Sequence, residues 1–206
     1  MPRAGDGKID DFVIDHAGAS YHVRPPEPQD AEAYVAYLQR NWPRFRGVMP
    51  TADDTTFAEE AHRQRFARMA DASGQPNVVA MMLFRGDEPG RIVGDIAFSN
   101  IVFGAFRACY LGFRIDEPLE GSGIMRRALE ICCDAMFVSF GLHRIMANFR
   151  PENERSRRLL QRLGFVEEGF ARDYLFIDGA WRDHVLTSLT HPDFHDGWIT
   201  RPPARH

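Results

Sequence analysis

The sequence predicts a single α/β domain built on one mixed β-sheet flanked by helices, and three observations lead to this prediction. Several segments alternate apolar and polar residues with a period of two, which is typical of strands with one buried face. Other segments repeat their apolar residues at the spacing of an amphipathic helix. The chain has 206 residues, 44% hydrophobic and 26% charged, a composition that can bury the core of one globular domain.

The first third of the chain is expected to contribute one strand and two helices. Residues 21–24 read as the end of a strand before a proline-rich break, and Asp30 stands at the N-cap position of a helix over 31–40. A loop rich in prolines and aromatic residues follows at 41–54. A second helix is predicted over 55–70, because its apolar residues recur at roughly helical spacing.

Strands are predicted for the middle of the chain. Two of them, over residues 77–84 and 91–103, are joined by the turn RGDEPG. A further strand covers residues 108–115. Its apolar face consists of residues at period two, namely Cys109, Leu111, Phe113 and Ile115.

The last third alternates strand and helix before a closing hairpin. We predict a strand over 142–149 and a helix over 153–163 that stops at Gly164. Residues 165–177 and 180–189 then form a hairpin around an Asp-Gly turn. This order of elements favours a mixed sheet over a doubly wound parallel one.

The segment EPLEGSGIMRRALE, residues 117–130, sets a glycine turn against the start of a helix that runs to about Phe140. The polar stripe of this helix is Arg126, Glu130 and Asp134, at positions i, i+4 and i+8. Its predicted apolar face consists of Ile124, Met125, Ala128, Leu129, Ile131, Cys132, Ala135 and Met136.

The glycine turn does not match two common phosphate-binding motifs. A P-loop needs Lys followed by Ser or Thr, and a dinucleotide fingerprint needs Gly or Ala where Arg126 stands. What remains is a strand, a turn and a helix N-terminus whose N–H groups favour an anion. Taken alone, the turn favours the other interpretation, a tight connection that needs glycine only for its backbone conformation.

Composition and charge exclude several classes of protein. The net charge of −4 does not indicate a direct nucleic-acid binder or a membrane-surface protein. Cys109, Cys132 and Cys133 are an odd set without zinc-ligand spacing, so we expect reduced thiols, no metal and a cytoplasmic protein. The polar N-terminus lacks the apolar core of a secretory signal, and no apolar run is long enough to span a membrane.

Four blocks in a fixed order carry a resemblance to a known family. YLGFRI, GSGIMRRAL and HRIMANFRPENERSRRLLQRLGF resemble the GNAT superfamily of acetyl-CoA-dependent N-acetyltransferases. EEGFARDYLFIDGAWRDHVLTSLTHPDF, together with GDIAFSNIVFGAFRACYLGF, is similar to the RimJ/RimL branch. The resemblance covers most of residues 20–195 and implies a GNAT domain over that range, with a mostly antiparallel sheet that is splayed at the acetyl-CoA site. Residues 1–19 are then a tail or leading strand, and 196–206 a C-terminal tail.

The resemblance implies that the glycine turn holds the pyrophosphate of acetyl-CoA on backbone amides, while the pantetheine arm lies along the preceding strand. The implied contact residues are Phe113, Arg114, Ile115, Leu119, Glu120, Gly121, Ser122, Gly123, Ile124 and Asn153. Asn153 is also a candidate N-cap for the helix that follows it. Pro118 stands where the family usually has Gln or Arg, and Glu120 where the turn is often uncharged or basic, so Arg126 or Arg127 is expected to balance charge.

Ser156, Asp173 and Tyr174 are the candidate catalytic residues. The resemblance implies that Ser156 faces the thioester sulfur and donates to the leaving thiolate, although a serine in the first turn of a helix also serves as a cap. RimI-like members use a glutamate base and a tyrosine acid, but Asn148 and Leu160 hold those positions here. Asp173 and Tyr174 are the nearest ionisable residues in a block typical of the branch.

The RimJ/RimL resemblance implies acetylation of the N-terminal α-amine of a protein, with a ribosomal protein that has a small first residue as the expected partner. Two alternatives remain open at this point. One is an acetyltransferase for small-molecule amines, because the branch includes such enzymes. The other is a non-catalytic acyl-CoA-binding or ribosome-associated protein, because the RimI-type acid and base are missing.

Overall fold

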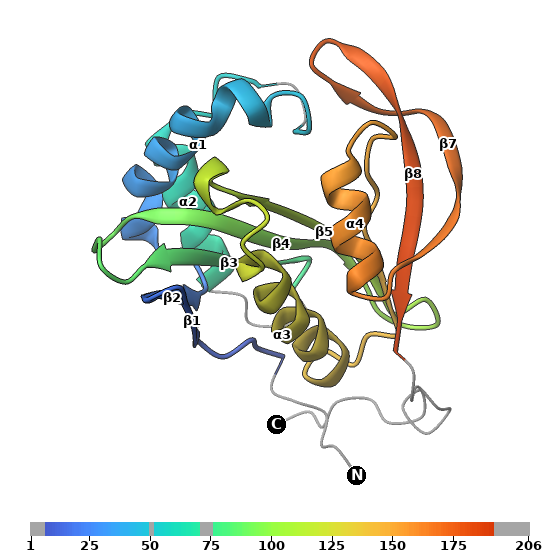
Figure 1. Ribbon diagram of the computed structural model, residues 1–206, viewed down its shortest axis with the longest axis horizontal. Helices are drawn as coiled ribbons and strands as arrows, with labels where there is room; N and C mark the ends of the chain where they lie inside the picture. The colour runs from blue at the N-terminus through green and yellow to red at the C-terminus, as the bar shows by residue number, and fades with distance from the viewer. Residues whose placement is uncertain (1–6, 50–51, 71–75, 192–206) are drawn as a thin grey trace.

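The computed structural model describes residues 7–49, 52–70 and 76–191, so the predicted tail at 196–206 lies outside the described residues. Within them, eight strands form one open sheet in the order β1-β2-β3-β4-β5-β6-β8-β7 (Figure 1). The strands are β1 (Phe12–His16), β2 (Ala19–Arg24), β3 (Val78–Arg85), β4 (Ile92–Val102), β5 (Ala108–Ile115), β6 (Arg144–Met146), β7 (Val166–Ile177) and β8 (Ala180–Thr190). Neighbours are antiparallel except for β5 and β6, which are parallel. The prediction of a mixed, mostly antiparallel sheet is confirmed.

Helices lie on both faces of this sheet (Figure 1). The α-helices are α1 (Ala31–Phe45), α2 (Glu59–Ala70), α3 (Ile124–Val138) and α4 (Glu154–Arg162), and short 3-10 helices cover Pro28–Asp30 and Glu117–Leu119. Strand β3 shows why two cores form, because its successive side chains point to opposite faces. Met81 and Leu83 join the core beneath α3, whereas Met82 and Phe84 join the core beneath α1 and α2.

The first two helices differ from their predicted bounds. Helix α1 continues past Pro43 to Phe45, because Phe45 is buried against the ring of Tyr37 rather than lying in a loop. Helix α2 begins four residues later than predicted. Asp53 accepts hydrogen bonds from Thr55 and Thr56, which holds these two residues in a turn ahead of the helix. Asp30 occupies the N-cap position of α1, but its carboxylate binds Arg24 and the backbone N–H of Glu27 instead of capping the helix.

The predicted face of α3 is largely correct, with one error. Ile131 is 43% exposed, because the buried face is centred on Met125, Cys132 and Met136 and Ile131 lies outside it. Cys133 is buried on this face instead. Arg126 and Glu130 form an exposed i,i+4 ion pair, so their placement on the solvent side is confirmed.

The sheet opens between β5 and β6, and this opening leaves one edge of β5 without a partner strand. Only three residue pairs join the two strands, from Ala108↔Arg144 to Tyr110↔Met146. The predicted strand over 142–149 then leaves β5 and follows β8, because the N–H groups of Ala147 and Phe149 donate to carbonyls of β8. Strand β5 therefore continues for five more residues with a partner on one side only. The predicted splay of the sheet is confirmed.

Candidate active site

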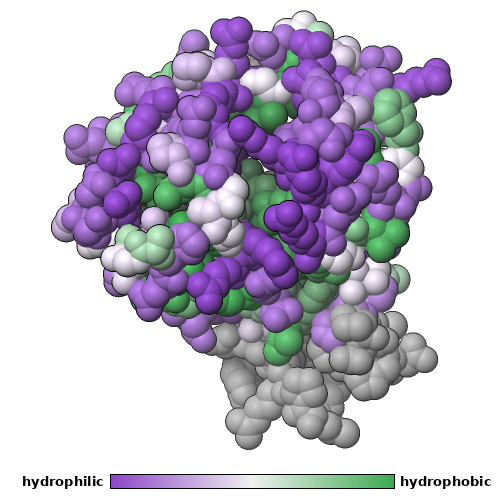
Figure 2. All heavy atoms as spheres, viewed as in Figure 1, coloured by the Kyte–Doolittle hydropathy of each residue, from purple (hydrophilic) through white to green (hydrophobic). Residues whose placement is uncertain are grey.

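The free edge of β5 is the first part of the candidate site. Asp116 N donates to Val93 O at 2.7 Å, and hydrogen bonding alternates along an antiparallel pair. The backbone groups of Phe113 and Ile115 therefore point away from β4, toward the side that β6 has left. An extended ligand can pair with such an edge as an added strand does. Figure 2 shows a recess in this face of the molecule, in the region that Figure 1 labels β5 and α4.

Arg114, the third residue predicted at this edge, has a different environment. Its guanidinium forms an ion pair of 2.5 Å with Asp95 and donates to Tyr34 Oη at 2.9 Å. Asp95 also accepts a 3.0 Å hydrogen bond from the hydroxyl of Tyr37 in α1. The side chain of Arg114 therefore holds α1 on the sheet. Only the backbone of Arg114 lies beside the free edge of β5.

The glycine turn lies at the end of β5 and leads directly into α3. Gly121 and Gly123 have φ angles of 74° and 91°, in the left-handed region that favours glycine. A Cβ atom at either position would meet nothing within 4 Å, so the space beside the turn is open. The first helical hydrogen bond runs from Arg127 N to Gly123 O, which leaves the amides of the first turn of α3 without helical acceptors.

Two backbone N–H groups at the turn, those of Ser122 and Ile124, are already engaged within it. Ser122 N donates to Leu119 O at 3.3 Å, and Ile124 N donates to Ser122 Oγ at the same distance. Ser122 Oγ in turn donates to Leu119 O at 2.6 Å. These contacts brace the turn in the shape that leaves both glycines open.

Glu120 lies beside the turn in a cluster of charges. Its side chain is 18% exposed and forms ion pairs with Arg44 from the end of α1 and with Arg155 from the start of α4. Arg126 is paired with Glu130, and Arg127 donates to Asp15 O at 3.0 Å. The expectation that Arg126 or Arg127 balances this charge was wrong, because residues distant in the sequence do so.

The start of α4 brings Asn153 and Ser156 together. Asn153 is the N-cap, and its Oδ1 accepts a 3.1 Å hydrogen bond from Ser156 N. The capping interpretation of Asn153 is confirmed, while its contact with the pantetheine arm stays a prediction. Ser156 is half-buried in the first turn of α4, and its role toward the thioester also stays a prediction.

Tyr174 lies in a polar cluster that the sequence did not reveal. Its hydroxyl accepts a 3.0 Å hydrogen bond from Asn148 Nδ2 and lies 3.5 Å from the hydroxyl of Tyr110 on β5. Asn148 Oδ1 accepts from Thr187 N at 3.2 Å, which fixes the orientation of the amide. Partial burial, together with Tyr110, raises the pKa of Tyr174 to about 12. The alternation of β5 was the available signal, since Tyr110 lies on the face opposite Cys109 and Leu111.

A bulge in β7 aims Tyr174 into this cluster. Ala171 pairs with His184 and Leu175 pairs with Arg182, so three residues of β7 face Asp183 alone. Asp173 has a φ of 46° at the centre of the bulge, and its N–H donates to Asp183 Oδ1 at 2.9 Å. Asp173 itself is exposed, and its backbone contact with Asp183 is that of a residue that shapes the bulge. A catalytic role for Asp173 stays a prediction.

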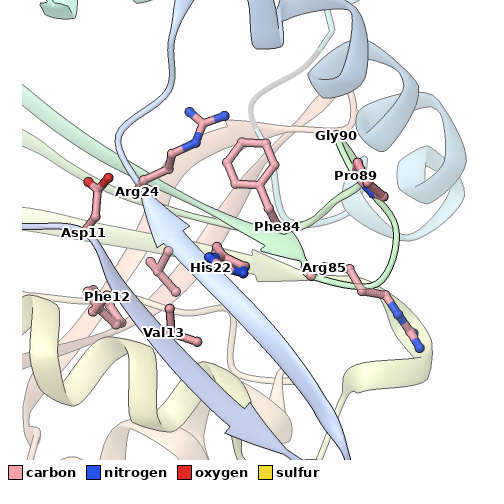
Figure 3. Close-up of a pocket in the computed structure, with 11 residues that line it drawn as sticks. Asp11, Phe12, Val13, His22, Arg24, Phe84, Arg85, Pro89 and Gly90 are labelled. Carbon is pink, nitrogen blue, oxygen red and sulfur yellow. The ribbon is translucent and has the colours of Figure 1, made fainter.

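A hollow of about 360 Å³ lies elsewhere, over β1, β2 and β3 (Figure 3). Arg24 lines it, but this arginine is paired with Asp30 and lies 4.0 Å from the ring centre of Phe84. Within residues 7–49, 52–70 and 76–191, no group of three His, Cys, Asp or Glu side chains is placed to hold a metal ion. No helix in the same residues is long and apolar enough to cross a membrane.

A strand with a free edge, followed by a glycine turn at a helix N-terminus, is the architecture expected of an acyltransferase that takes its acyl group from coenzyme A. Residues 21–166 match the family described as the acetyltransferase (GNAT) domain. The chain belongs to this family, and the prediction of an N-acetyltransferase of the RimJ/RimL branch is confirmed.

Similar proteins fall in this same branch. The chain is 41% identical to the [ribosomal protein uS5]-alanine N-acetyltransferase of Escherichia coli K12, over 85% of this chain and 90% of that one. The crystal structure of the ribosomal-protein-S5-alanine acetyltransferase of Vibrio fischeri matches with a TM-score of 0.83 and 35% identity, over 90% and 99% of the two chains. Mycobacterium smegmatis RimJ in complex with CoA-disulfide matches with a TM-score of 0.79 and 28% identity, over 90% of both chains.

Proposed function

We propose that this enzyme moves the acetyl group of acetyl-CoA to the N-terminal α-amine of a ribosomal protein whose first residue is alanine or another small residue. The observation that carries the proposal is the 41% identity, over 85% of the chain, to an enzyme named for alanine of ribosomal protein uS5. The free edge of β5 beside the open glycine turn supports it, because an extended arm with a terminal diphosphate fits that combination of sites.

The residues present fit acetyl-CoA in three places. Phe113 and Ile115 offer backbone groups to the pantetheine arm, and Gly121 and Gly123 let a diphosphate approach the amides of the turn. Asn153 caps α4 through its side-chain oxygen, so the NH₂ group is the part of its amide that can donate to the arm. When bound, acetyl-CoA supplies an acetyl group activated as a thioester.

Tyr174 is suited to donate a proton. Asn148 directs its NH₂ group at the Tyr174 oxygen, because its own carbonyl is taken by Thr187 N. The Tyr174 proton is therefore directed away from Asn148, and in the structure it is donated to the Tyr110 hydroxyl at 3.5 Å. This long contact can be exchanged for one to a sulfur atom. With a pKa of about 12, the hydroxyl stays protonated at neutral pH. In the transfer, a C–N bond forms, the C–S bond breaks, and the amine nitrogen gives up one proton to water. We assign protonation of the departing sulfur to Tyr174 or Ser156, whose hydroxyl then takes a proton back from water.

The acid–base groups of the site favour an α-amine over a lysine amine as the acceptor. An α-amine has a pKa of about 7.7–8.0, so roughly a third is neutral at pH 7.5. A lysine amine near 10.4 is neutral only in about one part in a thousand. Because Asn148 and Leu160 replace the RimI-type base and acid, a site of this kind suits the amine that needs less deprotonation.

The test uses two peptides of identical sequence that begin with alanine and contain one internal lysine. One has a free N-terminus and the other is N-blocked, and acetylation is followed by mass spectrometry together with thiol release from acetyl-CoA. We expect modification of the free peptide only. Equal modification of the blocked peptide would contradict the proposal. Turnover of small amines without peptides would favour a small-molecule acetyltransferase, and acetyl-CoA binding without thiol release would indicate a non-catalytic protein.

A further inference from the structure

The charged cluster of Arg44, Glu120 and Arg155 lies beside the glycine turn, where the diphosphate of acetyl-CoA is expected. Glu120 directly precedes Gly121, the first glycine of the turn. Its two partners come from different elements, since Arg44 lies in the last turn of α1 and Arg155 in the first turn of α4. The pair between Glu120 and Arg155 thus joins the glycine turn to the helix on the other side of the opening between β5 and β6.

The cluster carries one more positive than negative charge. A single carboxylate is shared by two guanidinium groups, and its side chain is only 18% exposed. Arg155 is the loosely held partner, because 68% of its side chain is exposed, against 28% for Arg44. Exposed ion pairs contribute little stability, so Arg155 is the group that can leave the cluster at small cost.

We propose that Arg155 binds the diphosphate of acetyl-CoA, and that Glu120 holds Arg155 until the donor arrives. A guanidinium matches phosphate oxygens with two parallel N–H donors, which favours the diphosphate over one shared carboxylate. Arg44 is then a positioning residue, since it keeps Glu120 paired and turned away from the phosphates after Arg155 has moved. This inference rests on acetyl-CoA being the donor, as proposed above.

The proposal predicts opposite effects for the two charges. Arg155→Gln is expected to raise the Kd of acetyl-CoA about tenfold, because a charge-assisted contact is lost. Glu120→Gln is expected to lower that Kd by about two- to fivefold, because the carboxylate that competes for the exposed Arg155 is removed. Arg44→Gln is expected to raise it, since Glu120 then keeps Arg155 and repels the phosphates.

The measurement is calorimetry with two donors, acetyl-CoA and S-acetylpantetheine, which has the same arm and thioester but lacks the diphosphate and the adenosine 3′-phosphate. Acetyl-CoA without its 3′-phosphate keeps the diphosphate and should show the same changes in Kd as acetyl-CoA, whereas loss of the Arg155→Gln effect with it would assign Arg155 to the 3′-phosphate. All three variants should bind S-acetylpantetheine as the wild type does. Arg158→Gln, an exposed arginine on the same helix, serves as the matched control and should change neither Kd. Thermal melts of each variant establish that it is folded.

Three further results would overturn the proposal. One is an unchanged acetyl-CoA Kd in Arg155→Gln, and another is an equal loss for both donors, which would assign Arg155 to the arm or to helix stability. Weaker acetyl-CoA binding by Glu120→Gln would likewise show that Glu120 supports the site rather than competing in it. Failure of the wild type to bind acetyl-CoA would instead contradict the proposed function, so the two failures are distinguishable without an acceptor.

Discussion

Replacing Gly123 by valine places a branched side chain where the candidate site needs bare backbone. Gly123 has a φ of 91° and is the N-cap of α3, with nothing within 4 Å of the position a Cβ would take. The protein itself therefore leaves room for the new side chain. The strain lies in the backbone alone, whereas a ligand resting on the turn would meet the two methyl groups.

The two effects differ in magnitude. A residue with a side chain in the left-handed region costs about 1–2 kcal/mol, with β-branched residues toward the upper end. A domain stability of roughly 5–15 kcal/mol tolerates this loss, so Gly123→Val should fold. Each charge-assisted hydrogen bond lost from the diphosphate removes about 1.5–3 kcal/mol. Loss of two such bonds weakens acetyl-CoA binding by about a hundredfold or more.

Calorimetry with acetyl-CoA and a thermal melt measure the two effects separately. Gly104→Val is the matched control, because Gly104 has a φ of 77° and equally open space but lies in the connection between β4 and β5. Both variants should lose similar stability, and only Gly123→Val should lose affinity. A folded Gly123→Val protein with an acetyl-CoA Kd within threefold of the wild type would refute the assignment of the diphosphate to this turn.

Three further predictions concern the chemistry and the thiols. Tyr174→Phe should lower kcat by about a hundredfold, with little change in the KM for acetyl-CoA, if its proton is transferred in the reaction; a fall below threefold in steady-state assays would argue against this. Ser156→Ala should lower kcat more than it raises the KM for acetyl-CoA, whereas an equal loss in a binding assay would indicate a capping or binding role. Burial raises the pKa of Cys109 and of Cys132 to about 12 and that of Cys133 well above its usual value, so a thiol reagent at pH 8 should label them only after unfolding; rapid labelling of the native protein would contradict their burial.

Local patterns predicted the parts of the fold that depend on one element. The alternation over residues 108–115 identified β5 with its bounds and its buried face, because the side on which a strand residue lies depends only on period two. The strand over 142–149 was predicted too long, since the switch of partner after Met146 depends on β8, which lies 34 or more residues later in the chain. The position of the Tyr174 hydroxyl depends on a bulge held by Asp183, and no local pattern of β7 signals it.

The charge of the glycine turn shows the same limit most directly. Judged from its neighbours in sequence, Glu120 repels a phosphate and weakens the case for an anion site. In the fold it is shared by Arg44, which lies 76 residues earlier, and by Arg155, which lies 35 residues later. The carboxylate is thereby overcompensated, and the positive end of α3 adds to the surplus. An acidic residue within an anion-binding turn is compatible with anion binding when two neighbouring helices, here α1 and α4, each supply an arginine. The sign of the Glu120→Gln effect on the acetyl-CoA Kd decides whether the two arginines outweigh the carboxylate.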